Sequence, residues 1–337
     1  MKRYLKKKIF TGILTILFAF VLTFFLTRMS PGNPIVTMAG RDNPNPAQIE
    51  YLMKKHGLDK SVPVQFINYS KGIIRGDFGK SIKSNQPVLQ IIASRLGPTI
   101  LLSLTATILS VILGTLLGLH AGRNQGSILD KFLTGLSYII DSIPVFWLAL
   151  VLIVVFATRL GWLPTSGMYS TRHRYEGFEK FLDLLKHMVL PLATIVIVRI
   201  PYYFRLAKAS VVSAMNQGFI KTLRASGMEE SKIFGKYVLR NALIPIITSF
   251  AMSLASVIAG VTLIEIVFAW PGMGRVLMDA IQARDYPVIS GLYLIISISV
   301  TFFMLLTDII YVIVDPRMKL EWQKRNLKKY QMSLFLV

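Results

Sequence analysis

Residues 208–241 read KASVVSAMNQGFIKTLRASGMEESKIFGKYVLRN, and they separate two long apolar runs, residues 187–204 and 242–268. A charged stretch of this length between apolar runs must lie in water. Its two halves are both compatible with helix and meet at Gly227, so we expect two short helices joined by a turn. Such a pair of helices is typical of a surface on which another protein docks.

An apolar composition and a strong positive charge occur together in this chain. Of its residues, 53% are hydrophobic, and the formal net charge is +21. A soluble domain cannot bury so much apolar surface, and a protein that binds nucleic acid is rarely this apolar. We therefore expect a membrane protein whose basic residues flank its spans, with no role in nucleic-acid binding.

Six apolar runs are long enough to cross a bilayer, for which about 20 residues are needed. They predict an all-α integral membrane protein with six transmembrane helices and a small outer segment between the first two. The first run follows a basic start that resembles a signal peptide, but no small-residue cleavage site follows it, so we expect it to remain a helix. The runs cover residues 9–27, 98–119, 132–158, 187–204, 242–268 and 288–314.

The distribution of lysine and arginine predicts which side of the membrane each loop faces. Counted over the termini and the short loops, twenty lie on the side that holds both termini, and seven lie on the other side. We therefore expect both termini and the loop 208–241 in the cytoplasm. The chain then divides into residues 1–27 (N-terminus and first span), an extracytoplasmic segment 28–97, a transmembrane core 98–314 and a cytoplasmic tail 315–337.

The outer segment 28–97 and several spans contain breaks in their helical pattern. The outer segment predicts turns at residues 31–34 and 43–46, a helix over 47–56, extended chain at 62–64 and a helix reaching Ile74. Within or beside the spans, four prolines are expected to bend the helices. These are Pro144, Pro191, Pro201 and Pro245.

No set of residues in the chain predicts an enzyme. Residues 76–81 (GDFGKS) end like a phosphate-binding loop, but Ile74 stands where such a loop needs its first glycine. The four histidines lack metal-ligand spacing, and no nucleophile is matched with a base and an orienting group. With no cysteines in the chain, disulfides and thiolate sites are excluded. We expect no catalytic residue, no bound cofactor and no metal.

Four ionisable residues fall inside the predicted spans: Asp141, Arg199, Glu265 and Asp308. Charged groups in a bilayer are costly, so each is a candidate for function. Two interpretations stay open. Arg199 pairs with a carboxylate such as Asp141 and fixes the packing of helices, or these groups line a water-filled path for a zwitterionic or cationic solute. Glu265 and Asp308 lie near the predicted interfaces, where hydration alone accounts for them.

Motifs that follow one another along nearly the whole chain resemble the membrane-spanning subunits of binding-protein-dependent ABC importers for dipeptides, oligopeptides and nickel. The outer segment with GDFGKS resembles the first, B-type, of the two permeases that such systems encode. The motifs are residues 28–34 (RMSPGNP), 56–81 (HGLDKSVPVQFINYSKGIIRGDFGKS), 142–147 (SIPVFW), 160–167 (LGWLPTSG), 224–245 around Gly227, 265–275 (EIVFAWPGMGR), 283–287 (ARDYP) and 315–317 (DPR).

The resemblance implies a type I importer fold in the bacterial inner membrane, with the loop between the fourth and fifth spans forming a coupling helix that seats in a separate ATPase. Where the general importer signature has Glu-Ala-Ala, this chain has Lys-Thr-Leu, as the peptide branch does. The coupling role then falls on Lys221, Thr222, Leu223, Arg224, Ala225, Ser226, Gly227, Met228 and Glu229. A contact with a binding protein is implied for Trp270, Pro271, Gly272 and Arg275.

The resemblance also implies partners for this chain. They are a homologous second permease, two ABC ATPases that use ATP and Mg²⁺, and an extracytoplasmic solute-binding lipoprotein. Peptide import is the expected function, and import of nickel or a metal chelate through the same fold is the alternative. A stand-alone channel or ion-driven carrier is a third possibility, and it alone requires no ATPase.

Overall fold

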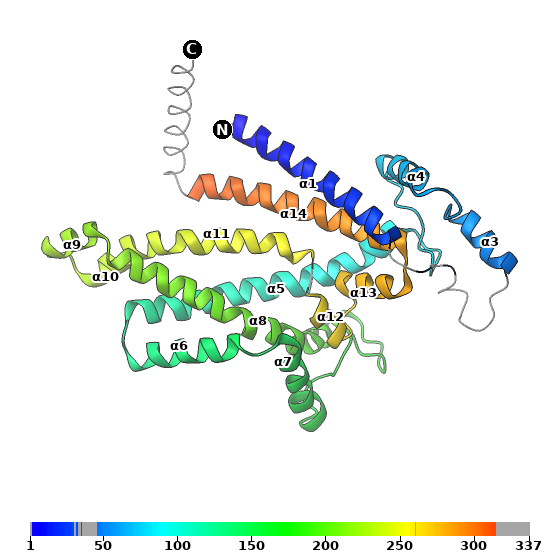
Figure 1. The fold of residues 1–337 in the computed structure, drawn as a ribbon. Coiled ribbons are helices and arrows are strands. Elements are labelled where there is room, and N and C mark those ends of the chain that lie inside the picture. Colours follow the sequence, from blue (N-terminus) through cyan, green and yellow to red (C-terminus); the bar gives the residue numbers. More distant parts are fainter. Residues whose placement is uncertain (1, 30–31, 33–34, 36–45, 260, 315–337) are drawn as a thin grey trace, which may run out of the picture. The chain divides into compact units, whose positions relative to one another are not determined.

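The computed structural model describes residues 2–29, 32, 35, 46–259 and 261–314, and the elements assigned there are helices (Figure 1). Two of them, η1 and η2, are π-helical. In chain order the elements are α1 (Lys2–Met29), α3 (Pro46–Lys55), α4 (Val62–Ile74), α5 (Val88–Arg123), α6 (Ile128–Asp141), α7 (Val145–Leu152), η1 (Ile153–Arg159), α8 (Gly177–Met215), α9 (Gly218–Ala225), α10 (Glu230–Lys232), η2 (Ile233–Val238), α11 (Leu239–Val257), α12 (Thr262–Val267), α13 (Met273–Ala283) and α14 (Tyr286–Val314).

Some predicted features fall where the chain is not described. Most of the turn at 31–34, nearly all of the turn at 43–46, the cytoplasmic tail 315–337 and the motif at 315–317 lie outside the described residues.

Five helical stretches in the described residues are long and apolar enough to cross a membrane. They include α1, α5, α8, α14 and the continuous helix of residues 230–257. A sixth is present if α6 and the α7–η1 helix count as one broken span. The prediction of one continuous third span over 132–158 is therefore wrong, because Pro144 stands before α7 and has no N–H to continue the helical ladder.

The fifth predicted span is also shorter than expected. The helix ends at Val257, and residues 262–267 form the separate helix α12. In the outer segment, α3 confirms the helix expected over 47–56. The prediction of extended chain at residues 62–64 is wrong, because α4 begins at Val62. Proline in the first turn of this helix costs no hydrogen bond, since the N–H it lacks has no partner there.

The chain folds as two compact units, which are described separately. The first unit contains residues up to 106 together with 143–196 and 255–301, and the second contains 107–142, 197–254 and the described residues from 302 onward. Helices α5, α8, α11 and α14 each begin in one unit and end in the other.

In the first unit, α1 packs against outer helix α4 through aromatic rings. Phe24 lies edge-on to Phe66 with 5.1 Å between ring centroids, and Phe20 stacks on Tyr69 at 5.7 Å. Gly12 of α1 touches Thr301 of α14, and α1 follows that part of α14 in Figure 1. The outer segment is thus fixed to the first transmembrane helix by apolar burial.

In the second unit, a row of glycines lets α5 and α8 approach closely. Gly114, Gly118 and Gly122 recur every four residues and therefore share one face of α5. A Cβ atom on Gly118 would lie 2.4 Å from the carbonyl oxygen of Phe204 in α8, a separation that real Cβ atoms do not adopt. Small residues at such an interface allow backbone-to-backbone contact between membrane helices.

Candidate functional site

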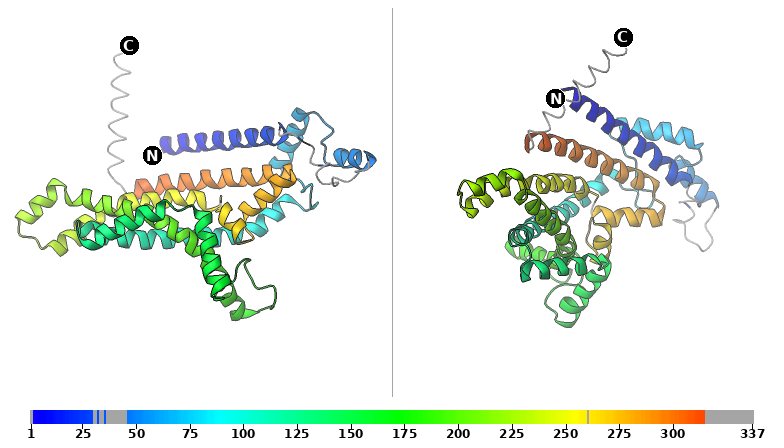
Figure 2. Two further views of the ribbon diagram at one scale, coloured as in Figure 1. Left: turned by 60° about the horizontal axis from the view of Figure 1, so that its bottom comes forward. Right: turned by 60° about the vertical axis from the view of Figure 1, so that its left-hand side comes forward.

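Helix α9 and the start of the continuous helix 230–257, which consists of α10, η2 and α11, lie together beyond the end of α8 in the second unit (Figures 1 and 2). Helix α9 ends at Ala225, and the chain reverses at Gly227, whose φ of +76° belongs to the left-handed region. The N–H of Met228 donates to the carbonyl of Leu223 at 3.2 Å, a hydrogen bond typical of a glycine-terminated helix. This confirms the turn at Gly227 with helix on both sides of it, but only α9 is a short helix, since the second half begins the helix 230–257. We call residues 218–232 the coupling segment.

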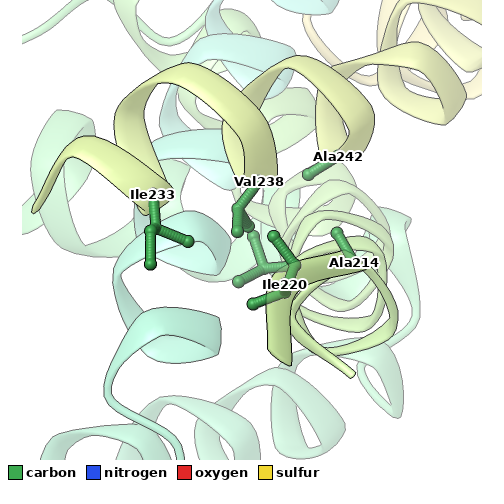
Figure 3. Close-up of a cluster of buried hydrophobic side chains, with 6 residues drawn as sticks. Ala214, Ile220, Ile233, Val238 and Ala242 are labelled. Carbon is green, nitrogen blue, oxygen red and sulfur yellow. The ribbon is translucent and has the colours of Figure 1, made fainter. Parts of the chain in front are cut away.

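Apolar side chains fix the coupling segment to the helices on both sides of it. Ile220 of α9 and Ile233 of η2 are fully buried and belong to one apolar cluster with side chains of α8 and α11. Figure 3 shows Ile220 beside Val238, with Ile233 at the edge of the group. The buried cluster consists of Val211, Ala214, Ile220, Ile233, Val238 and Ala242. Because one cluster contains residues of α8, α9, η2 and α11, displacement of α9 must also displace the ends of the two long helices.

Most of the predicted coupling residues are exposed on this apolar base. Only Leu223 and Met228 are half-buried, and both pack against the cluster. The guanidinium of Arg224 spans the Gly227 turn and donates to both carboxylate oxygens of Glu230, at 2.5 and 3.2 Å. This hydrogen bonding raises the pKa of Arg224 above its usual value. The exposed residues are Lys221, Thr222, Arg224, Ala225, Ser226, Gly227 and Glu229.

The coupling segment therefore presents a polar surface on a rigid apolar support. The fold-back has a glycine at its tip, and the residues around that glycine are exposed. The support is buried, so force applied at the tip is transmitted to α8 and α11 rather than absorbed by a loose loop.

Charged residues connect α6 to α8 next to the coupling segment. The ammonium of Lys208 pairs with the buried carboxylate of Asp130 and donates to the hydroxyl of Thr134 at 2.8 Å. One helical turn earlier in α8, Arg205 donates to Asp141 at 2.7 Å.

The suggested pairing of Asp141 with Arg199 is therefore wrong, because Asp141 ends α6 beside Arg205. The sequence analysis did not predict the Lys208–Asp130 pair. Ser127 and Asp130 together are typical of the start of a helix, so the position of Asp130 in a first turn could have been predicted.

Arg199 has a different environment from the other basic residues of α8. Its guanidinium donates at 2.7 Å to the hydroxyl of Thr107 in α5. One turn further along α8, the hydroxyls of Tyr202 and Tyr203 bond to Ser249 and Ser253 of α11, at 2.8 and 2.7 Å. Asp308, the last of the four predicted intramembrane charges, is half-buried in α14.

The motif at 265–275 forms a buried corner of the first unit. Glu265 is fully buried, and its carboxylate accepts hydrogen bonds from the hydroxyl of Thr99, at 2.8 Å, and from the backbone N–H of Arg275, at 3.1 Å. Hydration therefore does not account for Glu265, contrary to expectation. Its carboxylate caps the start of α13 and holds that helix to α5.

Two residues expected to touch a binding protein are inside this corner. Trp270 is fully buried and donates from its indole N–H to the carbonyl of Pro98 at 3.0 Å. Gly272 is buried as well, and it lies so close to Glu265 that a Cβ there would collide with the carboxylate. The predicted contact is wrong for these two residues, which build the corner, whereas Pro271 and Arg275 stay half-exposed.

Asp285 connects the outer segment to the junction of α13 and α14, which the sequence did not indicate. Its buried carboxylate accepts hydrogen bonds from the hydroxyl of Ser81 and from the backbone N–H groups of Ile82 and Lys83. The two motifs that contain these residues, GDFGKS and ARDYP, are therefore parts of one structural contact. No local pattern pairs residues so far apart in the chain.

Long apolar helices with a folded-back polar segment between two of them define this protein as a helical membrane protein. Residues 110–320 match the family described as binding-protein-dependent transport system inner membrane component, and residues 1–105 match its N-terminal counterpart. The chain belongs to this family, which comprises the membrane-spanning, non-catalytic subunits of ABC importers. Such a subunit works with an ATPase and a solute-binding protein.

Known proteins resemble this chain along most of its length. The oligopeptide transport system permease protein AppB of Bacillus subtilis is 33% identical over 320 residues, which cover 95% of this chain and 100% of that protein. The dipeptide transport system permease protein DppB of Escherichia coli K12 is 32% identical over 316 residues, which cover 89% and 93% of the two chains.

A solved structure supports the fold. A chain of the MetNI methionine ABC transporter in an inward-facing conformation superposes with a TM-score of 0.52 at 16% identity, covering 67% of this chain and 97% of that chain. The predicted all-helical fold of an ABC importer permease is confirmed. At this identity the likeness concerns the fold alone.

Proposed function

We propose that this chain is the permease subunit of an ATP-driven importer for dipeptides or oligopeptides in the bacterial inner membrane. The observation that supports it most is the match over nearly the whole chain to relatives named as peptide permeases. No relative quoted above is named for nickel, so import of nickel or a metal chelate is not favoured. Both termini and the coupling segment face the cytoplasm in this proposal.

The complete transporter contains four further subunits in this proposal. A homologous second permease forms the other half of the path, two ABC ATPases bind ATP and Mg²⁺, and an extracytoplasmic lipoprotein delivers the solute. This chain supplies the path and binds no cofactor of its own. A stand-alone channel or carrier has no use for a rigidly supported polar protrusion, which is why the ATPase-driven function is preferred.

The coupling segment converts movement of an ATPase into movement of α8 and α11. The exposed residues among 221–229 seat in the ATPase, and the buried side chains of Ile220 and Ile233 connect them to both long helices. When ATP binding draws the two ATPases together, the coupling segment follows, and the ends of α8 and α11 move with it. The path then alternates between inward-facing and outward-facing states.

The outer surface receives the loaded binding protein. Pro271 and Arg275 remain available for that contact, and so do the exposed parts of the outer segment 46–97. Trp270 and Gly272 support this surface from inside by shaping the corner at residues 265–275.

Uptake by the whole transporter tests the proposal. Membranes or proteoliposomes that contain the full complex are supplied with ATP and with a labelled dipeptide, a labelled tetrapeptide or nickel. We expect ATP-dependent peptide accumulation that unlabelled peptide competes away and nickel does not. Accumulation of nickel without peptide, or of peptide without any ATPase copurifying, contradicts the proposal.

A further inference from the structure

Arg199 places a positive charge at the depth of the membrane interior. It lies inside the apolar run 187–204, about 18 Å along α8 from His187 and about 8 Å from Phe204 at 1.5 Å per residue. Its guanidinium reaches Thr107, which stands near the middle of the apolar run 98–119 of α5. The charge is therefore held in the interior of the spans and does not extend toward an aqueous interface.

The hydrogen-bonding capacity of this guanidinium is largely unused. Among the residues that the structure describes, Arg205 and Lys208 of the same helix each meet a carboxylate, whereas Arg199 meets only a neutral hydroxyl. A guanidinium has five N–H donors in a planar fork that matches a carboxylate. Arg199 is half-buried, so part of its surface is open to a ligand.

A row of hydroxyl groups continues from Arg199 along α8. Tyr202 and Tyr203 follow at the third and fourth positions and so share its side of the helix. Tyr202 is 51% exposed although it lies inside an apolar run, and its hydroxyl bonds to Ser249 of α11. A cation with adjacent hydroxyls is a poor surface for lipid tails and a good one for a polar solute.

We propose that Arg199 binds a carboxylate of the peptide as it crosses the membrane, with Tyr202 as an adjacent hydroxyl. This inference rests on the proposed function, because it assigns a contact to the substrate of that importer. Thr107 positions the guanidinium by accepting one of its hydrogen bonds. The carboxylate belongs to the C-terminus of the peptide, since every unmodified peptide carries that group whatever its side chains are.

The first test compares a peptide with its C-terminal amide in the complete importer. The wild type transports the free acid faster than the amide. In Arg199→Gln the ratio of the two uptake rates falls to about one. Uptake of the free acid falls about tenfold or more, as expected for loss of a hydrogen bond to a charged group. Arg199→Lys retains most of the preference. A wild type that transports both peptides equally, or a preference that survives in Arg199→Gln, overturns the inference.

The second test restores the charge chemically. Because this chain contains no cysteine, Arg199→Cys introduces a single thiol into the subunit. Modification with 2-aminoethyl methanethiosulfonate adds an ammonium group and should recover at least fivefold in uptake, whereas methyl methanethiosulfonate adds a neutral group and should not. Equal recovery with both reagents, or recovery with neither, overturns the inference. Wild-type importer treated with each reagent controls for thiols in the partner subunits.

Thr107→Val separates ligand binding from helix packing. If Arg199 only ties α8 to α5, Thr107→Val and Arg199→Gln must lower uptake by the same factor. If Arg199 binds the peptide, Thr107→Val lowers uptake less and leaves the preference for the free acid. A wild type that takes up no peptide at all contradicts the proposed function instead, so the two failures are distinguishable.

Discussion

The hydroxyl of Ser81 donates a hydrogen bond of 2.5 Å to the carboxylate of Asp285, a residue 204 positions further along the chain. The backbone N–H of Ile82 donates to the same carboxylate at 3.0 Å. The turn that follows, residues 83–87, is exposed. This carboxylate therefore anchors the exposed turn to the start of α14, in addition to the hydrogen bonds that the turn makes within itself.

Asp285→Asn should loosen that turn. The amide keeps the shape of the side chain but presents an NH₂ group to N–H donors, which leaves a buried group unpaired at a cost of about 1–3 kcal/mol. Hydrogen exchange of residues 80–87 should become roughly tenfold faster or more, at about 1.4 kcal/mol per factor of ten. Asp279→Asn, at an exposed position of α13, is the control and should leave exchange unchanged. Unchanged exchange in Asp285→Asn contradicts the assigned role.

Gly118→Leu should destabilise the packing of α5 against α8. The added Cβ meets the carbonyl oxygen of Phe204 at 2.4 Å, and a backbone atom cannot swing away as a side chain can. Overpacking of this kind costs about 1–3 kcal/mol or more, so the melting temperature of the purified subunit should fall by several degrees. Gly135→Ala, on α6 with no atom within 4 Å of the added Cβ, should leave it unchanged or raise it.

Gly227→Val should uncouple the transporter from its ATPases. Valine is strained at a φ of +76° by roughly 1–3 kcal/mol, because its branched Cβ crowds the backbone there. The turn then changes shape, and peptide uptake should fall at least tenfold while membrane insertion persists. Gly227→Asn is the matched control, since asparagine tolerates this conformation. Equal uptake in the valine and asparagine variants contradicts a role for the turn geometry.

Ile220→Ala should loosen the support of the coupling segment. Ile220 is fully buried, and truncation of a buried isoleucine costs about 2–5 kcal/mol. Hydrogen exchange over residues 218–232 should accelerate, and less ATPase should copurify with the variant. Lys221→Ala changes the neighbouring exposed residue and should leave the exchange rates as they are. If both variants exchange alike, the buried cluster does not hold the segment in place.

The local pattern predicted the coupling segment well and the intramembrane charges less well. The glycine at 227 and the helix-compatible residues on both sides of it determine the fold-back, so the sequence alone was sufficient. Asp141 and Arg199 were suggested as a pair because both lie in predicted spans. The structure gives Asp141 to Arg205 instead, because pairing depends on the rotation and depth of each helix, which hydropathy does not report.

Burial also separated residues that the sequence had grouped together. Trp270, Pro271, Gly272 and Arg275 stand in one motif and were all expected at the outer surface. Trp270 and Gly272 are instead enclosed by Glu265 and Pro98, partners that no periodicity identifies. The third span was predicted in part. Pro144 indicated a bend from the sequence alone, but only the structure shows that α6 ends at Asp141 and that helix begins again at Val145.

The sequence by itself determined that this protein is a helical membrane protein with a water-exposed fold-back, because apolar runs and a glycine-centred polar stretch act locally through solvation and backbone geometry. Tertiary structure alone decided which group each charge meets. Lys208 meets the carboxylate of Asp130, whereas Asp285, Glu265 and Arg199 meet the hydroxyls of Ser81, Thr99 and Thr107. These outcomes depend on distances between helices far apart in the chain, and such distances are set only when the helices pack.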